Sequence, residues 1–212
     1  MPNHVTNRVT IAGPAESVAE LRKSCFAMHK PEVPAFWREK ASAGGGGGAQ
    51  EWLDRIAKRE AEPEYEVFDF NRIIPAPAFI ANGDGLISGS REDQTGRNWH
   101  RWNSKKWGTK WNAYKLSIVE DEPGKLVFQF DTAWSSPTPI LDVIAEWFPE
   151  LHIVAEYFDE GHCFWGVDTK PVNAAKFSVQ EFGGNDVSEL AISERNRLCK
   201  KLKGYDPAEE EV

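Results

Sequence analysis

Residues 114–168 show two hairpin patterns with one strongly amphipathic helix pattern between them. Large apolar side chains recur at every second position from Leu126 to Phe130, which is the period of a strand with one buried face. After the start signal Ser135-Ser136-Pro137, apolar residues follow the spacing of one helical face from Ile140 to Phe148, and Pro149 ends this pattern. The order hairpin, helix, hairpin predicts an antiparallel sheet with the helix packed on it.

A strand and a helix are also predicted at the start of the chain. The segment from Val5 to Ile11 alternates as a strand does, and Gly13-Pro14 then introduces a helix whose apolar face includes Val18 and Leu21. A further strand is predicted from Tyr65 to Ile74. Two such strand–helix–strand units interleave into one sheet, so we predict an α+β fold: a ferredoxin-like antiparallel sheet with helices packed on one face.

The segment between these units has the character of an insertion. Residues 44–48 are consecutive glycines, and their backbone freedom does not suit a core element. A helix is predicted from Gln50 to Glu62 with Trp52, Leu53 and Ile56 facing inward. We therefore expect a single domain over residues 1–205, with an insertion at about 30–64, a C-terminal helix from about Val187 to Lys203, and an acidic tail at 206–212.

The composition is that of a globular protein of the cytoplasm. Of the 212 residues, 41% are hydrophobic and 27% are charged. No apolar run approaches the roughly 20 residues that a membrane-spanning helix needs, and the N-terminal residues do not resemble a signal peptide. Cys25, Cys163 and Cys199 are odd in number and far apart, which argues against a disulfide framework. We expect a cytoplasmic protein without membrane contact.

The charge is distributed unevenly along the chain. The net charge is −8, yet no acidic residue lies between Asp93 and Glu120, where six basic residues lie. The other 19 basic and 33 acidic residues give a net charge of −14. The chain is therefore an acidic body with one basic stripe, which we define as residues 97–115. An acidic body favours basic partners at long range, whereas a basic stripe can hold an anion.

The basic stripe is also rich in tryptophan. Its candidate residues for binding a nucleic acid or another partner are Arg97, Trp99, Arg101, Trp102, Lys105, Lys106 and Lys110. Exposed indoles could stack on unpaired bases while the cations follow the phosphates. The structural alternative is a short helix that buries its indoles on the sheet and extends its Lys and Arg heads into solvent. Because a strand follows directly, we expect Trp107 and Trp111 to be core anchors.

Five short segments occur along residues 1–168. They are Pro2-Asn3-His4-Val5-Thr6-Asn7, Phe70-Asn71-Arg72-Ile73-Ile74-Pro75, Trp107-Gly108-Thr109-Lys110-Trp111-Asn112-Ala113-Tyr114, Phe130-Asp131-Thr132-Ala133-Trp134-Ser135-Ser136-Pro137 and Tyr157-Phe158-Asp159-Glu160-Gly161. In this order they resemble the YubB-type ferredoxin-like family of phage and plasmid proteins. The resemblance implies a ferredoxin-like core and an origin on a mobile genetic element. It implies no catalytic residues.

Other residue patterns give little support for catalysis. The five histidines form no pair at metal-ligand spacing, and His162 and Cys163 are adjacent in a predicted strand, so they would face opposite ways. Buried thiols are expected for Cys163 and Cys199. Asp159-Glu160-Gly161 fits a hairpin turn better than an acid–base pair, and Asp131-Thr132 fits an anchor for the following loop. We predict neither a metal nor a cofactor.

Three functional hypotheses follow. The leading one is a non-catalytic phage- or plasmid-encoded accessory protein that binds a host macromolecule, as an anti-CRISPR or anti-restriction protein does. Its expected partner is a host protein, bound through the acidic body or the insertion. The alternative is a nucleic-acid-binding module that uses the basic stripe. The third is an enzyme acting on a small ligand, which requires a pocket lined by several of the residues Asp69, Asp131, Trp134 and His162. The oligomeric state stays open.

Overall fold

The computed structural model describes residues 3–31, 39, 49–78 and 98–207. The glycine run 44–48, the loop 81–94, Arg97 and the acidic residues 209–211 lie outside the described residues. The elements are β1 (His4–Ala12), α1 (Ala15–Cys25), β2 (Phe26–His29), α3 (Ala49–Glu60), β3 (Tyr65–Phe68), α4 (Phe70–Ile73), α6 (Trp99–Lys106), β4 (Tyr114–Glu122), β5 (Lys125–Ala133), α7 (Thr138–Trp147), β6 (His152–Asp159), β7 (Phe164–Lys170), β8 (Ser178–Gly183) and α8 (Glu189–Lys203).

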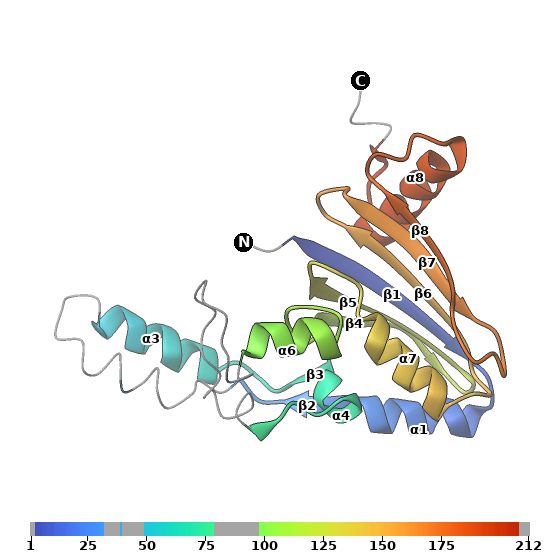
Figure 1. The fold of residues 1–212 in the computed structure, drawn as a ribbon. Coiled ribbons are helices and arrows are strands. Elements are labelled where there is room, and N and C mark those ends of the chain that lie inside the picture. The colour runs from blue at the N-terminus through green and yellow to red at the C-terminus, as the bar shows by residue number, and fades with distance from the viewer. Residues whose placement is uncertain (1–2, 32–38, 40–48, 79–97, 208–212) are drawn as a thin grey trace.

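The largest sheet has six strands in the order β4-β5-β1-β6-β7-β8 (Figure 1). Every neighbouring pair is antiparallel, and β1 lies between β5 and β6. Because β5 and β6 are therefore parallel to each other, α7 joins them in a crossover that passes over β1. This is the split βαβ arrangement, and it confirms the predicted ferredoxin-like, α+β fold. Strands β7 and β8 extend the sheet beyond it.

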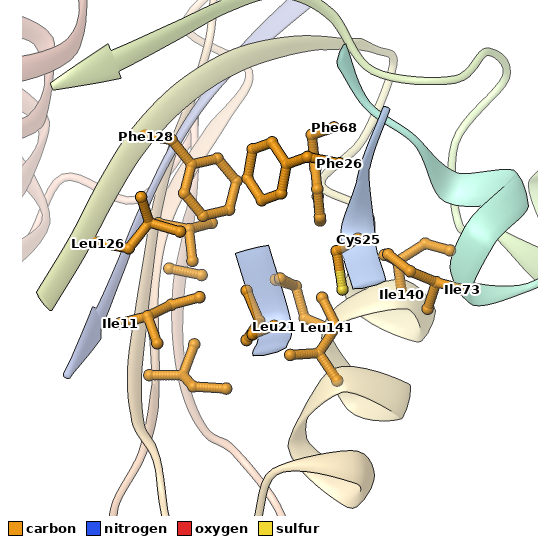
Figure 2. Packing of buried hydrophobic residues seen from close by; sticks show 14 of the residues in the cluster. Ile11, Leu21, Cys25, Phe26, Phe68, Ile73, Leu126, Phe128, Ile140 and Leu141 are labelled. Atoms are coloured by element: carbon orange, nitrogen blue, oxygen red, sulfur yellow. The ribbon is translucent and has the colours of Figure 1, made fainter. Parts of the chain in front are cut away.

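One face of this sheet carries the main core. α1 and α7 lie on the same side of the sheet (Figure 1). Leu21 of α1 and Leu141 of α7 pack between the helices and sheet residues such as Ile11 and Phe128, all fully or almost fully buried (Figure 2). The apolar periodicity in the sequence that predicted a helix after Pro137 is therefore confirmed, because this is the face that α7 buries.

The opposite face carries a smaller core beneath α8. Successive side chains of a strand point to opposite faces, so Ala155 of β6 belongs to the main core and Phe158 to the second one, with Trp165 and Leu198. The buried carboxylate of Glu156 also faces α8, where it accepts hydrogen bonds from Arg197 (2.8 Å) and from Lys201. Burial alone would raise the pKa of Glu156, but these bonds lower it. The predicted C-terminal helix is confirmed as α8, which packs on the face of the sheet opposite the main core.

The segment from Tyr65 to Ile74 is not one strand of the main sheet as predicted, because its strand β3 pairs with β2 in a separate two-stranded sheet. The strand β3 ends at Phe68, and the short helix α4 begins after Asp69. The reason is a cap: the Asp69 carboxylate accepts hydrogen bonds from the Asn71 backbone N–H (3.0 Å) and from the Asn112 amide (2.7 Å). This turn buries Phe70 and Ile73 together in the main core, where an extended strand would separate them.

Two further expectations from the sequence need correction. The helix predicted from Gln50 to Glu62 exists as α3, but Trp52 is 41% exposed, whereas Ile56 is buried as expected. Strand β8 was not predicted, because only Val179 and Phe182 in it are large and apolar, they do not alternate, and all its residues except Phe182 are exposed. As an edge strand it is held by hydrogen bonds to β7 and needs little apolar surface of its own.

Candidate binding surfaces

The structure divides the tryptophans of the basic stripe between the core and the surface. Trp107 is 4% exposed, and its indole N–H donates to the carbonyl of Ile74 (2.9 Å). Trp102 is half-buried and packs edge-on against Trp107. The prediction for Trp107 is therefore confirmed. The prediction for Trp111 is wrong, because this residue lies beyond the turn at Gly108 and exposes 37% of its surface.

The cations of the stripe lie mostly on the surface. Arg101, Lys105 and Lys106 of α6 are exposed, and Trp99 beside them is half-buried. Lys115 is exposed too, but its ammonium pairs with Asp131 (3.0 Å). α6 begins at Asn98, whose side chain accepts from the Arg101 backbone N–H (3.0 Å).

Lys110 is the cation with the most specific surroundings. Its ammonium lies 4.3 Å from the ring centroid of Trp134 and 5.1 Å from that of Trp111, so it is held between two indoles. Trp134 is 44% exposed, and its ring packs edge-on against that of His100, with 5.1 Å between the ring centroids. We call Lys110, Trp111, Trp134 and His100 the Trp–Lys patch. Among them only Lys110 was a predicted binding residue; Trp134 was considered only for an enzyme pocket.

The backbone beneath the Trp–Lys patch is fixed by hydrogen bonds. The Asn103 amide donates to the Lys110 carbonyl (2.8 Å), and the Lys110 N–H donates to the Ala133 carbonyl (3.3 Å). The Thr109 hydroxyl donates to the same carbonyl (2.7 Å). Gly108 has a φ of +77°, and a Cβ there would lie 2.6 Å from Pro139 Cδ, so only glycine suits this turn. The patch is therefore held on both α6 and the end of β5.

A second surface feature is an open groove of about 880 Å³ beside α1. Three large apolar residues line it: Val18 and Phe26 are almost fully buried, whereas Met28 is 63% exposed. The exposed carboxylates of Glu16 and Glu122 also line it. We call this the acidic groove.

Arg22 holds the two sides of the acidic groove together. Its guanidinium forms a bidentate pair with Glu66 (2.5 and 2.6 Å) and contacts Asp121 (3.3 Å). It also lies 4.3 Å from the ring centroid of Phe26. The hydrogen bonds that Arg22 donates to the Glu66 carboxylate raise the pKa of Arg22 above its ordinary value. The described lining thus holds four carboxylates, of Glu16, Glu66, Asp121 and Glu122, against the two cations Arg22 and Lys23.

The residues considered for an enzyme pocket are not brought together. Asp69 caps α4, whereas Asp131 bonds Thr6 (2.8 Å) and Lys115 on the sheet face opposite the main core. His162 bonds Tyr205 (2.8 Å), which follows α8. Asp159 closes its turn by accepting from the Gly161 and Cys163 N–H groups (both 3.1 Å), which confirms the hairpin turn. Thr132 donates to the Ser135 carbonyl (2.7 Å), so it anchors the following loop as expected.

Two predictions about the cysteines and histidines need correction. Cys25 and Cys199 are buried, but Cys163 is exposed, contrary to the expectation of a buried thiol. His162 and Cys163 lie in a turn before β7 and not in a strand, and His162 has a φ of +56°. Among the described residues, no three His, Cys, Asp or Glu side chains are grouped so that they could hold a metal ion.

One feature that the sequence did not predict is a cluster of acidic groups around the buried Tyr157. The Tyr157 hydroxyl lies 3.0 Å from the Glu181 carboxylate and 3.5 Å from that of Asp168, which is 2% exposed. Gly166 makes room for this hydroxyl, since a Cβ there would lie 2.5 Å from it. Burial, and then the charge of Glu181, raises the pKa of Asp168 to about 6. The sequence does carry a sign of this cluster, because Gly166, Asp168 and Lys170 stand at every second position of β7 and so share one face of the strand.

Asp168→Asn should remove one pH dependence of stability. Because the folded state raises the pKa of Asp168 from 3.8 to about 6, the folded state binds this proton more tightly. The free energy of unfolding therefore falls as pH rises from about 4 to about 6 and then levels off. At pH 8 the variant should exceed the wild type by about 1–3 kcal/mol, with little difference at pH 4. Urea unfolding followed by circular dichroism measures this difference.

The control for this prediction is Glu64→Gln, which removes one exposed carboxylate ahead of β3. It should leave the pH profile of the wild type unchanged. An identical fall in stability between pH 4 and pH 6 in Asp168→Asn and in the wild type would contradict the assignment of this titration to Asp168.

Comparisons with known proteins agree with this architecture. The sheet order defines a ferredoxin-like protein, and a family model described as a ferredoxin-like domain in Api92-like protein matches residues 106–186. The crystal structure of the protein api92 from Yersinia pseudotuberculosis is similar to this chain, with a TM-score of 0.54 and 14% sequence identity. The match covers 86% of this chain and 99% of api92. At this identity it shows a shared fold. No curated protein matches the chain.

Within the described part of the chain, no helix is both long enough and apolar enough to cross a bilayer.

Proposed function

We propose that this protein is a non-catalytic accessory protein of a phage or plasmid that binds a host protein in the bacterial cytoplasm. By this binding it inhibits a defence system of the CRISPR or restriction kind. The YubB-type resemblance supports the origin on a mobile element. The observation that carries the mode of action is the acidic groove, which combines the exposed side chain of Met28 with the exposed carboxylates of Glu16 and Glu122.

The chemistry of the acidic groove favours a basic partner segment. The net charge of the chain outside the basic stripe is −14, so the long-range field attracts cations. At contact, Glu16 and Glu122 can pair with Lys or Arg of the partner, and Met28 can cover an apolar side chain with its flexible thioether. Proteins that handle nucleic acids carry such basic segments, and defence nucleases are among them.

The double variant Glu16→Lys with Glu122→Lys tests this proposal. Both side chains are exposed, so the substitutions should leave the fold intact while reversing the charge of the groove. The matched control is Glu146→Lys with Glu189→Lys, which changes the net charge equally at exposed positions of α7 and α8. Each protein is immobilised, host lysate is passed over it, and retained proteins are identified by mass spectrometry.

We expect the wild type and the control to retain one specific host protein that the groove variant loses by at least about tenfold, since like-charge contact costs several kcal/mol. Expression of the wild type, but not of the groove variant, should raise the plating efficiency of a phage on a host with an active defence system. Equal retention and equal protection by the groove variant would contradict the proposal. So would turnover of a nucleotide or nucleic acid by the purified protein.

A further inference from the structure

The Trp–Lys patch combines exposed aromatic faces with fixed positive charge. Trp111 and Trp134 expose 37% and 44% of their surface, and the Lys110 ammonium lies between their rings. Two exposed indoles on either side of one cation form a patch, and exposed patches with apolar surface mark interaction sites, whereas singly exposed apolar residues are common. The proposed host-protein binding at the acidic groove does not use these residues, which lie at the end of β5 and beside α6.

The backbone of Trp134 shows that the position of its indole has a cost. Its φ is +79°, a left-handed conformation that is strained for a bulky side chain. The strand ends one residue before, and the Trp134 N–H donates to the Asn3 carbonyl (3.0 Å), so the surrounding structure enforces this conformation. Glycine would adopt the same backbone without strain. Folding alone therefore does not favour tryptophan at this position.

The described residues of α6 and of the turn that follows it carry only positive charge. Arg101, Lys105 and Lys106 are exposed on α6, and the sequence contains no acidic residue between Asp93 and Glu120. The Asn103 side chain joins this helix to Lys110. Cations on one element and exposed rings on the adjoining turn match the two parts of an unpaired nucleotide, which are its phosphate and its base.

We infer that the Trp–Lys patch binds single-stranded nucleic acid. Trp111 and Trp134 stack on unpaired bases, and Lys110 lies near the phosphate between them. The strand continues along Arg101, Lys105 and Lys106. A duplex is a poor ligand because its base faces are already stacked. DNA and RNA share the chemistry of base face and phosphate, so the contacts named here do not depend on the sugar.

Trp134→Gly tests the inference without loss of fold. Glycine suits the φ of +79°, so the free energy of unfolding should stay equal or rise. Binding of fluorescein-labelled dT12 and rU12, measured by anisotropy at 50 mM salt, should weaken by about tenfold or more, because one stacked base is lost. The matched control is Trp147→Ala, which removes an equally exposed tryptophan (45%) from α7 and should leave the affinity unchanged.

A second variant tests the cations. Lys105→Ala with Lys106→Ala should reduce the slope of log Kobs against log salt by about 0.7 for each lost phosphate contact. The inference is overturned if neither oligonucleotide binds the wild type at 50 mM salt, if Trp134→Gly binds as tightly as the wild type, or if a duplex of equal length binds better. The groove variant Glu16→Lys with Glu122→Lys should bind the oligonucleotides at least as tightly as the wild type, so failure of the two proposals is distinguishable.

Discussion

Trp107→Ala is expected to lower the free energy of unfolding by about 3–5 kcal/mol. The indole is 4% exposed, lies in the main core and contacts the rings of Phe70 and Trp102 at 5.8 and 5.4 Å. Its removal leaves a cavity where α4 meets α6 and also leaves the Ile74 carbonyl without its indole donor. Urea unfolding followed by far-ultraviolet circular dichroism measures the change, because tryptophan fluorescence would itself be altered.

Two variants separate burial from the indole hydrogen bond. Trp107→Phe keeps much of the ring volume and should cost less, about 1–2 kcal/mol, for the lost donor and a smaller cavity. Trp111→Ala, at an exposed position of the same stripe, should stay within about 1 kcal/mol of the wild type. If Trp107→Ala and Trp111→Ala were equally destabilising, the division of the stripe into core and surface tryptophans would be wrong.

The sequence predicted best what local apolar periodicity determines. The face of α7 and the hairpin of β4 and β5 follow from spacing alone, since Ile140, Ile144 and Phe128 all enter one core. The sequence predicted poorly the local structure that depends on a single hydrogen bond. The Asp69 cap turns an expected strand into a helix, and strand periodicity gives no sign of it.

The Trp–Lys patch was only partly predictable for a similar reason. Lys110 was identified from composition, but the exposure of Trp111 depends on the left-handed turn at Gly108. Register shifts between Tyr114 and Glu120 further separate the sequence pattern from the face on which a side chain lies. Trp134 has a positive φ that no residue pattern indicates, because tryptophan rarely adopts it.

The acidic groove could not be found from the sequence, for another reason. Arg22 comes from α1, Glu66 from β3 and Asp121 from β4, so the groove joins three segments that are far apart along the chain. The sequence did predict its charge, because the acidic excess outside the basic stripe is visible from residue counts. Composition thus indicated the sign of the charge, and only the fold shows where these carboxylates lie together.

Lys170→Met is expected to lower the free energy of unfolding by about 3–4 kcal/mol, although methionine fits the buried stem of the side chain. Lys170 is fully buried, and its ammonium donates to the carbonyls of Phe148 (3.3 Å), Pro149 (2.8 Å) and Leu151 (2.9 Å). Burial lowers its pKa, and the charge of Glu150 opposes this. All three protons of the ammonium are thereby used, and the charge lies at the negative end of the α7 dipole.

The loss should be specific to this lysine. Phe148 and Pro149 keep second donors in the backbone N–H groups of Leu151 (3.1 Å) and Asn173 (2.7 Å), so most of the cost falls on the Leu151 carbonyl and on the lost charge. Lys176→Met, at an exposed position after β7, should change the free energy of unfolding by less than about 0.5 kcal/mol. The midpoints of urea unfolding at pH 7, measured for both variants and the wild type, test this prediction. Equal midpoints would mean that the end of α7 and the entry to β6 hold together without the ammonium.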